Sequence, residues 1–379
     1  MKKYLVGIII ALNIICGMAL ASDVRAWVAT KSHGNILIIG ETHFGTQLEL
    51  DRFYNEIIRP YALNSDAILA ESVDGSSLPG LCKDIQYRNN NFWMFSDLDF
   101  LNELSTTISL LKDAGIEDGS ILRDVIREDG HSDKKQYFGT FMHLVIGGKL
   151  SEALTQYKDY FPPVPGISAR ILNERFHLSS HAVNDSQKWF VGLDTIKSID
   201  DILCNAKDAD YLNFVKAYLA KMGVESKVLV ALKNNEIEMG FMNRYISERY
   251  IFYMNCAASS VSCKLGDVRG QDSVSSQETN KISDSQLIYE DGPEIYHFMV
   301  ELRNLSWIEK VNQAEVNFPL TFMSVGAAHL PDVSFNGKIK KGLISMLRDD
   351  GFTLKEVLFS PEFTESEIKA LYKSVTTIH

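Results

Sequence analysis

The stretch NILIIGETH, residues 35–43, gives the clearest indication of the fold. Its first five residues, of which only Asn35 is polar, form a short apolar run, which is typical of a strand buried on both faces of a parallel sheet. A glycine ends the run, and His43 follows three positions later. The same order recurs where the apolar run at 320–325 ends at Gly326 and His329 follows. Because the carboxyl ends of parallel strands line the ligand crevice of an open α/β sheet, we expect both histidines at that edge.

The segment after the first strand predicts a βαβ unit. Thr46 and Glu49 form a capping box that opens a helix, and a second apolar strand at 67–70 ends at Glu71. A strand, a helix and a strand within about 36 residues favour a parallel pair. Further short strands are expected at 188–191, 320–325 and 353–359. The chain is therefore predicted to have an α/β fold with a mostly parallel central sheet flanked by helices.

The middle of the chain has a different pattern. Residues 78–183 are mixed but mainly helical, with an amphipathic helix at 98–111, and we expect them to form a cap or insertion over the core. Residues 268–285 are polar and predict a flexible surface loop. One domain, residues 22–379, is predicted to contain both. Other helices are expected at 199–255, 294–313 and 337–349.

The N-terminus predicts an exported protein. Two lysines precede an apolar stretch at 5–16, and Ala19-Leu20-Ala21 offers a small-x-small cleavage site, so residues 1–21 are expected to be a cleaved signal peptide. The apolar stretch is shorter than the roughly 20 residues that span a bilayer. We therefore expect the mature chain in the periplasm or fully secreted, without stable membrane insertion.

Charge and cysteine content narrow the classes of partner. The formal net charge of -11 argues against nucleic acid or an anionic membrane surface as the main partner. Four cysteines lie beyond the signal peptide, and an even number in an oxidising compartment predicts disulfides, most strongly between Cys256 and Cys263. A zinc site is disfavoured because the chain has no paired C-x-x-C motif. The other two cysteines are Cys82 and Cys204.

Four candidate side chains follow predicted strands. If those strands are parallel neighbours, the imidazoles of His43 and His329 converge with the carboxylates of Glu71 and Asp194. Such a cluster can bind a divalent metal ion (Mn, Co or Zn) and generate hydroxide near neutral pH. A His/Glu pair can instead act without metal as a general base toward water. The residue pattern leaves both open.

Three nearby residues have a structural interpretation as well. Glu41, beside the first histidine, either orients a ligand or faces solvent. Asp194 could simply begin a helix, as strand-end carboxylates often do. Trp307 lies on the apolar face of a predicted helix and is expected in the core.

The C-terminal region carries a specific combination of motifs. It reads Arg303-Asn304-x-x-Trp307, then VGAAHL at 325–330, then a helix and a glycine-aromatic turn at 351–352. This combination resembles the end of TraB/GumN proteins, and the Gly-x-x-His motif at 40–43 fits the same family. Residues 192–195 resemble its Gly-Leu-Glu-Thr motif, with Asp194 in place of glutamate. The similarity covers roughly a third of the chain, at both ends.

The resemblance implies a site and two related activities. TraB/GumN proteins are related to the TIKI metalloproteases and, more distantly, to erythromycin esterases and ChaN-like haem-binding proteins. By resemblance His43, Glu71 and His329 take the metal or catalytic positions, with Arg303 and Asn304 near them. The sequence Gly-Glu-Thr-His at 40–43 is closer to the esterase and ChaN-like form, since TraB/GumN proteins more often carry threonine after that glycine.

Two functions follow from these expectations. The first is a metal-dependent hydrolase of a peptide or an ester, in which Arg303 stabilises negative charge in the transition state. The second is a non-catalytic periplasmic protein that binds haem or another small molecule on the same fold. An enzyme should lose turnover on Glu71→Gln while staying folded, whereas a carrier should tolerate that change.

Overall fold

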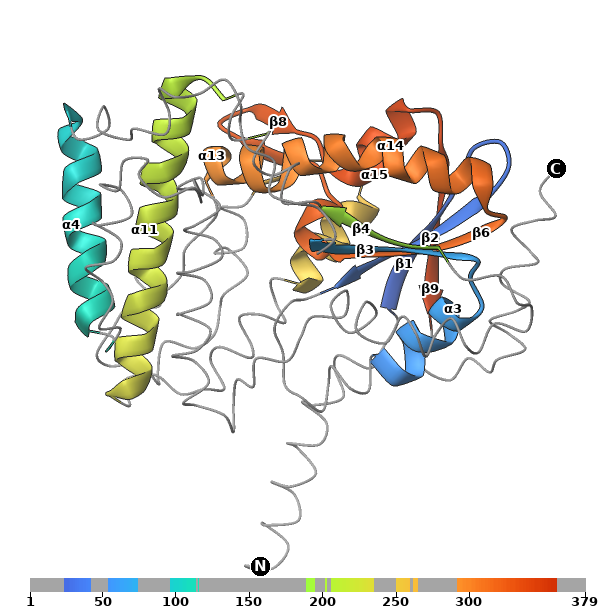
Figure 1. Ribbon diagram of the computed structural model, residues 1–379, viewed down its shortest axis with the longest axis horizontal. Helices are drawn as coiled ribbons and strands as arrows, with labels where there is room; N and C mark the ends of the chain where they lie inside the picture. The colour runs from blue at the N-terminus through green and yellow to red at the C-terminus, as the bar shows by residue number, and fades with distance from the viewer. Residues whose placement is uncertain are drawn as a thin grey trace, which may run out of the picture.

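The structure is a computed structural model (Figure 1). Residues 24–41, 54–73, 96–113, 115, 189–194, 202, 206–234, 250–259, 262–264 and 292–359 are described. The predicted signal peptide, the capping box, the loop at 268–285, most of the insertion at 78–183 and both Cys82 and Cys204 lie outside these residues.

A six-stranded sheet forms the centre of the fold, in the order β4-β3-β6-β2-β1-β9. The first four strands in that order are parallel neighbours, as predicted for the strands that carry the candidate site. β1 pairs antiparallel with both β2 and β9. The strands are β1 (Val24–Thr30), β2 (Asn35–Glu41), β3 (Ala67–Val73), β4 (Trp189–Asp194), β6 (Leu320–Gly326) and β9 (Thr353–Phe359).

The sheet is therefore mixed, and the prediction of a mostly parallel sheet is wrong. The reason lies in the short connection at 31–34, because a parallel crossover needs a dozen or more residues and a tight turn forces β1 to run antiparallel to β2. The α/β class, with helices flanking the sheet, is confirmed.

Helices cover both faces of the sheet because its side chains alternate. Ile36 and Ile38 point into a core shared with Trp307 of α14 (Leu302–Asn317) and with α15 (Leu343–Asp349). Leu37 and Ile39 point the other way, toward η2 (Tyr54–Ile58) and α3 (Arg59–Leu63). Figure 1 shows α14 and α15 on one side of the sheet and α3 on the other.

Two long helices pack together beside this core. They are α4 (Leu98–Asp113), where an amphipathic helix was predicted, and α11 (Asp208–Lys233). α11 contacts the helical run that leads into α14, where the rings of Phe214 and Phe298 lie 4.9 Å apart. That run consists of α13 (Pro293–Tyr296) and the π-helical turn η8 (His297–Glu301). Among the described helices, none is long and apolar enough to cross a membrane.

A small second sheet lies next to the carboxyl end of β6. It contains β5 (Cys263–Lys264), β7 (Val333–Phe335) and β8 (Lys338–Lys340), in the order β5-β7-β8. The predicted helix at 337–349 is therefore wrong over its first residues, because Asn336 and Gly337 form the turn of a hairpin. The predicted disulfide between Cys256 and Cys263 is confirmed, and it joins the helical segment 250–258 to β5.

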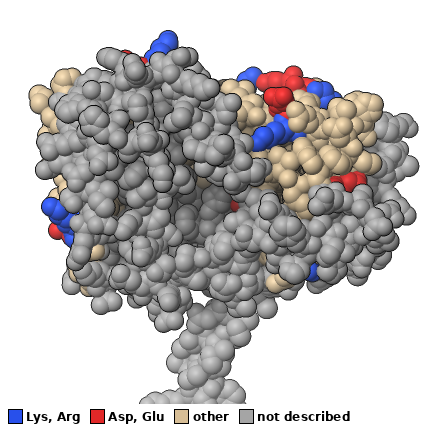
Figure 2. Space-filling view, viewed as in Figure 1, with Lys and Arg blue, Asp and Glu red and all other residues tan. Residues whose placement is uncertain are grey.

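On the described surface, several acidic side chains form ion pairs with basic ones. Figure 2 shows acidic and basic side chains next to each other where this face is described. One exposed ion pair of the described surface joins Nζ of Lys341 and a carboxylate oxygen of Asp349 at 2.6 Å.

Glu315 of α14 fixes the turn between β1 and β2. One carboxylate oxygen, Oε1, accepts the backbone N–H groups of Ser32 and His33 at 2.6 Å each and that of Gly34 at 3.3 Å. Glu315 is 1% exposed. These bonds tie the hairpin that makes the sheet mixed to the helix that carries the candidate site.

Gly342 provides the first testable prediction, because the backbone of the segment after β6 passes directly over it. A β-carbon at this position would overlap the carbonyl oxygens of Leu330 and Pro331. We expect Gly342→Ala to lower the free energy of unfolding by about 2–4 kcal/mol, measured by chemical denaturation. Gly337→Asn is the control, because that position has a φ of +79° and open space, which asparagine tolerates. An unchanged midpoint for Gly342→Ala would contradict this packing.

Candidate functional site

The structure brings four of the predicted site residues together at the carboxyl ends of the parallel strands. Asp194 is the last residue of β4, and Glu71 lies in β3 at a shift in register relative to β4. His329 ends the short 3-10 turn η9 (Ala327–His329) that directly follows β6. Arg303 reaches them from the first turn of α14. Their side chains are between 2% and 12% exposed, so the network is almost enclosed.

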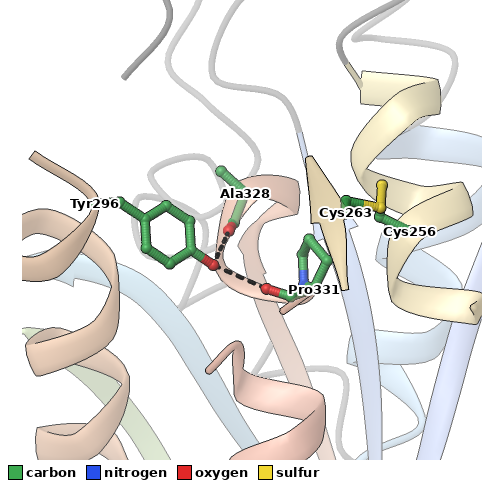
Figure 3. Close-up of a disulfide and its surroundings, with 5 residues drawn as sticks. All are labelled: Cys256, Cys263, Tyr296, Ala328 and Pro331. Carbon is green, nitrogen blue, oxygen red and sulfur yellow. Dashed lines mark hydrogen bonds between the residues drawn. A yellow bond between two sulfur atoms is a disulfide. The ribbon is translucent and has the colours of Figure 1, made fainter. Parts of the chain in front are cut away.

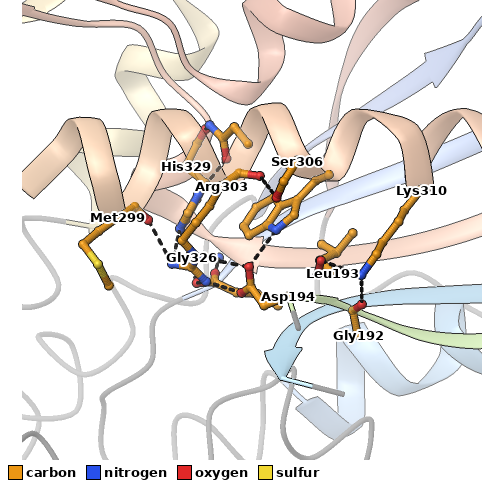
Figure 4. A network of polar contacts seen from close by, with 12 residues as sticks. Gly192, Leu193, Asp194, Met299, Arg303, Ser306, Lys310, Gly326 and His329 are labelled. Atoms are coloured by element: carbon orange, nitrogen blue, oxygen red, sulfur yellow. Dashed lines mark hydrogen bonds and ion pairs between the residues drawn. The ribbon is translucent and has the colours of Figure 1, made fainter. Parts of the chain in front are cut away.

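The guanidinium of Arg303 is at the centre of this network (Figure 4). Its Nε and Nη2 donate to the two carboxylate oxygens of Asp194, and Nη2 also donates to Oε1 of Glu71 at 2.8 Å. Nη1 donates to the carbonyl oxygen of Met299 at 2.9 Å and lies 3.3 Å from Nε2 of His329. An arginine has five N–H groups, so each of them has an acceptor.

The charge of Arg303 is stabilised by its two acidic partners. Burial alone would lower the pKa of Arg303. The carboxylates of Glu71 and Asp194 raise the pKa by more than burial lowers it, so the net shift is upward. The buried side chain is therefore a cation between two anions. Glu71 is fixed from a second side, because its Oε2 accepts the backbone N–H of Gly326 at 2.6 Å.

The π-helical turn η8 helps to place this arginine. In this turn the backbone N–H of Leu302 donates to the carbonyl oxygen of His297, five residues back, rather than four as in an α-helix. Met299, inside the turn, presents its carbonyl oxygen to the side chain of Arg303. A wide turn of this kind occurs often beside functional residues.

Asn304 sets the tautomer of His329. The Asn304 Nδ2 donates to the backbone carbonyl oxygen of His329 at 2.9 Å, so its Oδ1 must face the ring. That Oδ1 lies 2.7 Å from Nδ1 of His329 and can only accept, so Nδ1 carries the proton. In the neutral ring Nε2 then carries no proton and has a lone pair. This atom lies 3.3 Å from Nη1 of Arg303 and 3.3 Å from Oε1 of Glu71.

The environment keeps the His329 ring neutral. Burial is the largest effect and lowers the pKa of His329, the negative charge of Glu71 opposes this, and the net shift is downward. The positive charge of Arg303 adds to the lowering, while Asp194 opposes it. Trp307 packs against the ring at 4.5 Å between centroids. His329 is therefore a fixed, neutral imidazole at neutral pH, the form that can accept a proton.

The backbone around His329 is held at every residue. The five consecutive carbonyl oxygens of residues 327–331 each accept a hydrogen bond. The donors include Asn304 at residue 329, the hydroxyl of Tyr296 at residues 328 and 331, and the backbone of Ile344 at residue 330. Figure 3 shows Tyr296 reaching this turn near the disulfide. Such a turn presents its histidine in one orientation.

The outcome differs for two other predicted residues, Glu41 and His43. Glu41, the last residue of β2, is 2% exposed, and its Oε2 accepts the hydroxyl of Ser324 at 3.0 Å. Glu41 therefore does not face solvent. Its negative charge adds to the effect of burial, which is the larger one, in raising the pKa of Tyr250. His43 lies outside the described residues, so the predicted meeting of the two histidines stays a prediction.

Trp307 has a second role that its sequence position did not indicate. It is fully buried, as predicted for a core residue, but its indole Nε1 donates to Oδ1 of Asp194 at 2.9 Å. The spacing of Arg303 and Trp307 at i and i+4 places both on one face of α14, which is the signal that could have revealed the contact. Asp194 is likewise fixed by the network and does not begin a described helix.

The two described candidate metal ligands have mixed suitability for an ion. Oε1 of Glu71 and Nε2 of His329 are 3.3 Å apart, and two ligands of one tetrahedral zinc ion lie about 3.4 Å apart. Both atoms, however, face N–H groups of Arg303. In the described part of the chain, no three His, Cys, Asp or Glu side chains are grouped as a metal site. The donor atoms are the right types, but an arginine already binds them.

Comparison of the chain with models of protein families, with characterised proteins and with solved structures finds no match.

Proposed function

We propose that the chain is an exported hydrolase of a peptide or small ester, in which His329 acts as general base toward water. The observation that carries the proposal is the neutral imidazole of His329, with its tautomer set by Asn304 and its Nε2 facing Glu71. A general base must be unprotonated at the working pH, and burial provides this. The disulfide between Cys256 and Cys263 supports export, since such bonds persist in oxidising compartments.

The charges around His329 suit proton transfer. Before the transfer, the two carboxylates of Glu71 and Asp194 face the single positive charge of Arg303. When Nε2 accepts a proton from water, the new imidazolium balances the second carboxylate. Glu71 and Asp194 thus offset part of the cost that burial and the charge of Arg303 impose on the imidazolium.

A divalent metal ion is a second candidate for water activation. It is favoured by the 3.3 Å separation of Glu71 and His329, with His43 as a third ligand by resemblance. Bound there, Mn, Co or Zn would supply a hydroxide near neutral pH. Both routes require Nε2 of His329 to exchange its 3.3 Å contact with Nη1 of Arg303 for the water molecule or the ion.

The proposal is tested with untagged mature protein and a panel of chromogenic esters and fluorogenic peptides. We expect the wild type to hydrolyse at least one class, and His329→Ala to lower kcat/KM for it by about 100-fold or more. His297→Ala is the matched control, because His297 lies on the same helical run and contacts Glu301 and Lys340 outside the network. Binding of a compound without turnover, haem included, would favour the carrier instead.

The pH profile of that reaction provides a further prediction. Because the pKa of His329 is lowered from its ordinary value of 6.5, we expect kcat/KM to fall only below pH 6.5, through the lowered pKa. Above that pKa the imidazole of His329 is neutral, so its titration no longer changes kcat/KM. A pH–rate profile from pH 4 to 8 on wild-type enzyme measures this, and an acid limb centred above pH 6.5 would exclude His329 as the base.

A further inference from the structure

We infer that Arg303 is the resident cation of this site: its guanidinium takes the position for which a divalent metal ion would otherwise compete. The inference does not depend on whether the chain hydrolyses anything. It differs from the expectation that Arg303 stabilises a transition state, because a group that does so needs an N–H free to meet the substrate.

The first argument is the use of the five N–H groups. Two donate to Asp194, one to Glu71, one to the carbonyl oxygen of Met299 and one to Nε2 of His329. All are bound within the protein, so Arg303 acts through the groups it holds. It is a positioning residue for Glu71 and His329.

The second argument is the identity of the acceptors. Carboxylate oxygens and an imidazole nitrogen are the ligands that zinc and manganese prefer. Here both oxygens of Asp194, one oxygen of Glu71 and Nε2 of His329 surround one guanidinium, and the other oxygen of Glu71 binds the backbone of Gly326. A metal ion could take these ligands only by displacing Arg303.

The third argument is the cost of leaving these acidic groups without a cation. Glu71 and Asp194 have side chains that are 7% and 2% exposed, and two buried carboxylates without a positive partner are strongly destabilising. If the guanidinium is removed, the site becomes a preformed pocket of negative charge and one imidazole. Such a pocket should recruit a divalent ion from solution.

The experiment measures metal binding directly. Untagged, chelator-treated and dialysed wild type, Arg303→Gln and Arg303→Gln/His329→Ala are titrated with Zn²⁺ and with Mn²⁺ by calorimetry. We expect Arg303→Gln to bind one equivalent at least about 100-fold more tightly than the wild type, and the double variant to lose that binding. Lys310→Gln is the matched control, because Lys310 lies two turns further along the same helix and donates to the carbonyl oxygens of Gly192 and Leu193 (Figure 4). It should gain no metal affinity.

If Arg303→Gln does not fold, zinc binding by the wild type and by two single variants still tests the inference. We expect any zinc bound by the wild type to be unaffected by His329→Ala and by Glu71→Gln. One tight equivalent in the wild type that both substitutions remove would overturn the inference. A folded Arg303→Gln with the metal affinity of the wild type would overturn it as well. Because the readout is metal binding, either result is separate from success or failure of the hydrolase proposal.

Discussion

Glu71→Gln is expected to lower kcat/KM of the wild-type reaction by about 100- to 10,000-fold while the protein stays folded. The reason is the distance of 3.3 Å between Oε1 of Glu71 and Nε2 of His329. In the wild type, a proton accepted at Nε2 forms an imidazolium beside a carboxylate. In the variant, that imidazolium stands beside an amide and the guanidinium of Arg303, 3.3 Å away.

The effect on catalysis should exceed the effect on stability. Glutamine keeps a carbonyl oxygen that can accept the backbone N–H of Gly326, and the loss of charge-assisted bonding to Arg303 should cost about 1–3 kcal/mol of unfolding free energy. Steady-state kinetics on the panel substrate measure the first effect and thermal unfolding the second. A shift mainly in kcat would assign Glu71 to the chemical step rather than to substrate binding.

The matched control for Glu71→Gln is Glu301→Gln. Glu301 is also a partly buried acid with cationic neighbours, since its Oε2 lies 2.6 Å from Nδ1 of His297 and 3.0 Å from Nζ of Lys340. These contacts are separate from the network around Arg303, so Glu301→Gln should keep the wild-type kcat/KM. A Glu71→Gln variant with full turnover would exclude the His329–Glu71 pair from the mechanism. If the wild type and Glu71→Gln bind a ligand equally well and neither turns it over, the protein is a carrier.

The parallel strands could be predicted because each is largely buried and therefore reads as a mostly apolar run. The predicted strand at 320–325 and the observed β6 differ by one residue, and β9 has the predicted bounds. β1 was missed, although its residues 26–29 form an apolar run of four, because this run lies directly after the predicted signal peptide and no glycine or carboxylate marks its end. The sheet became mixed through this strand, so the error in sheet type and the missed strand have one cause.

The sequence predicted which residues form the site better than it predicted the hydrogen bonds between them. Strand ends place Glu71, Asp194 and His329 at one edge, and the motif around 303–307 places Arg303 nearby. No pattern in the sequence shows that one guanidinium binds all three, because that depends on the side-chain geometry at the π-helical turn. For the same reason Trp307 reads as a core residue, although its indole N–H fixes Asp194.

Glu315→Ala is expected to have the largest effect on stability, with a loss of about 3–5 kcal/mol of unfolding free energy at neutral pH. The substitution removes one carboxylate from three backbone N–H groups, those of Ser32, His33 and Gly34. Gly34 is buried, so its N–H would lose its partner away from water. Chemical denaturation of Glu315→Ala beside Glu309→Gln measures the effect, since Glu309 is exposed on the same helix and should change stability by less than about 0.5 kcal/mol.

The contribution of Glu315 should depend on pH in one direction. Burial opposes the ionised form, but the hydrogen bonds from His33, Ser32 and Gly34 outweigh it, so the pKa of Glu315 in the folded protein lies below its ordinary value of 4.5. A carboxyl group with a lowered folded pKa stabilises the fold fully above its unfolded pKa and loses this effect as pH falls through the folded value. The difference between wild type and Glu315→Ala should thus be constant from pH 7 to about 5 and shrink below pH 4.5. A difference that grows on acidification would mean that the carboxylate is not what holds the β1–β2 turn.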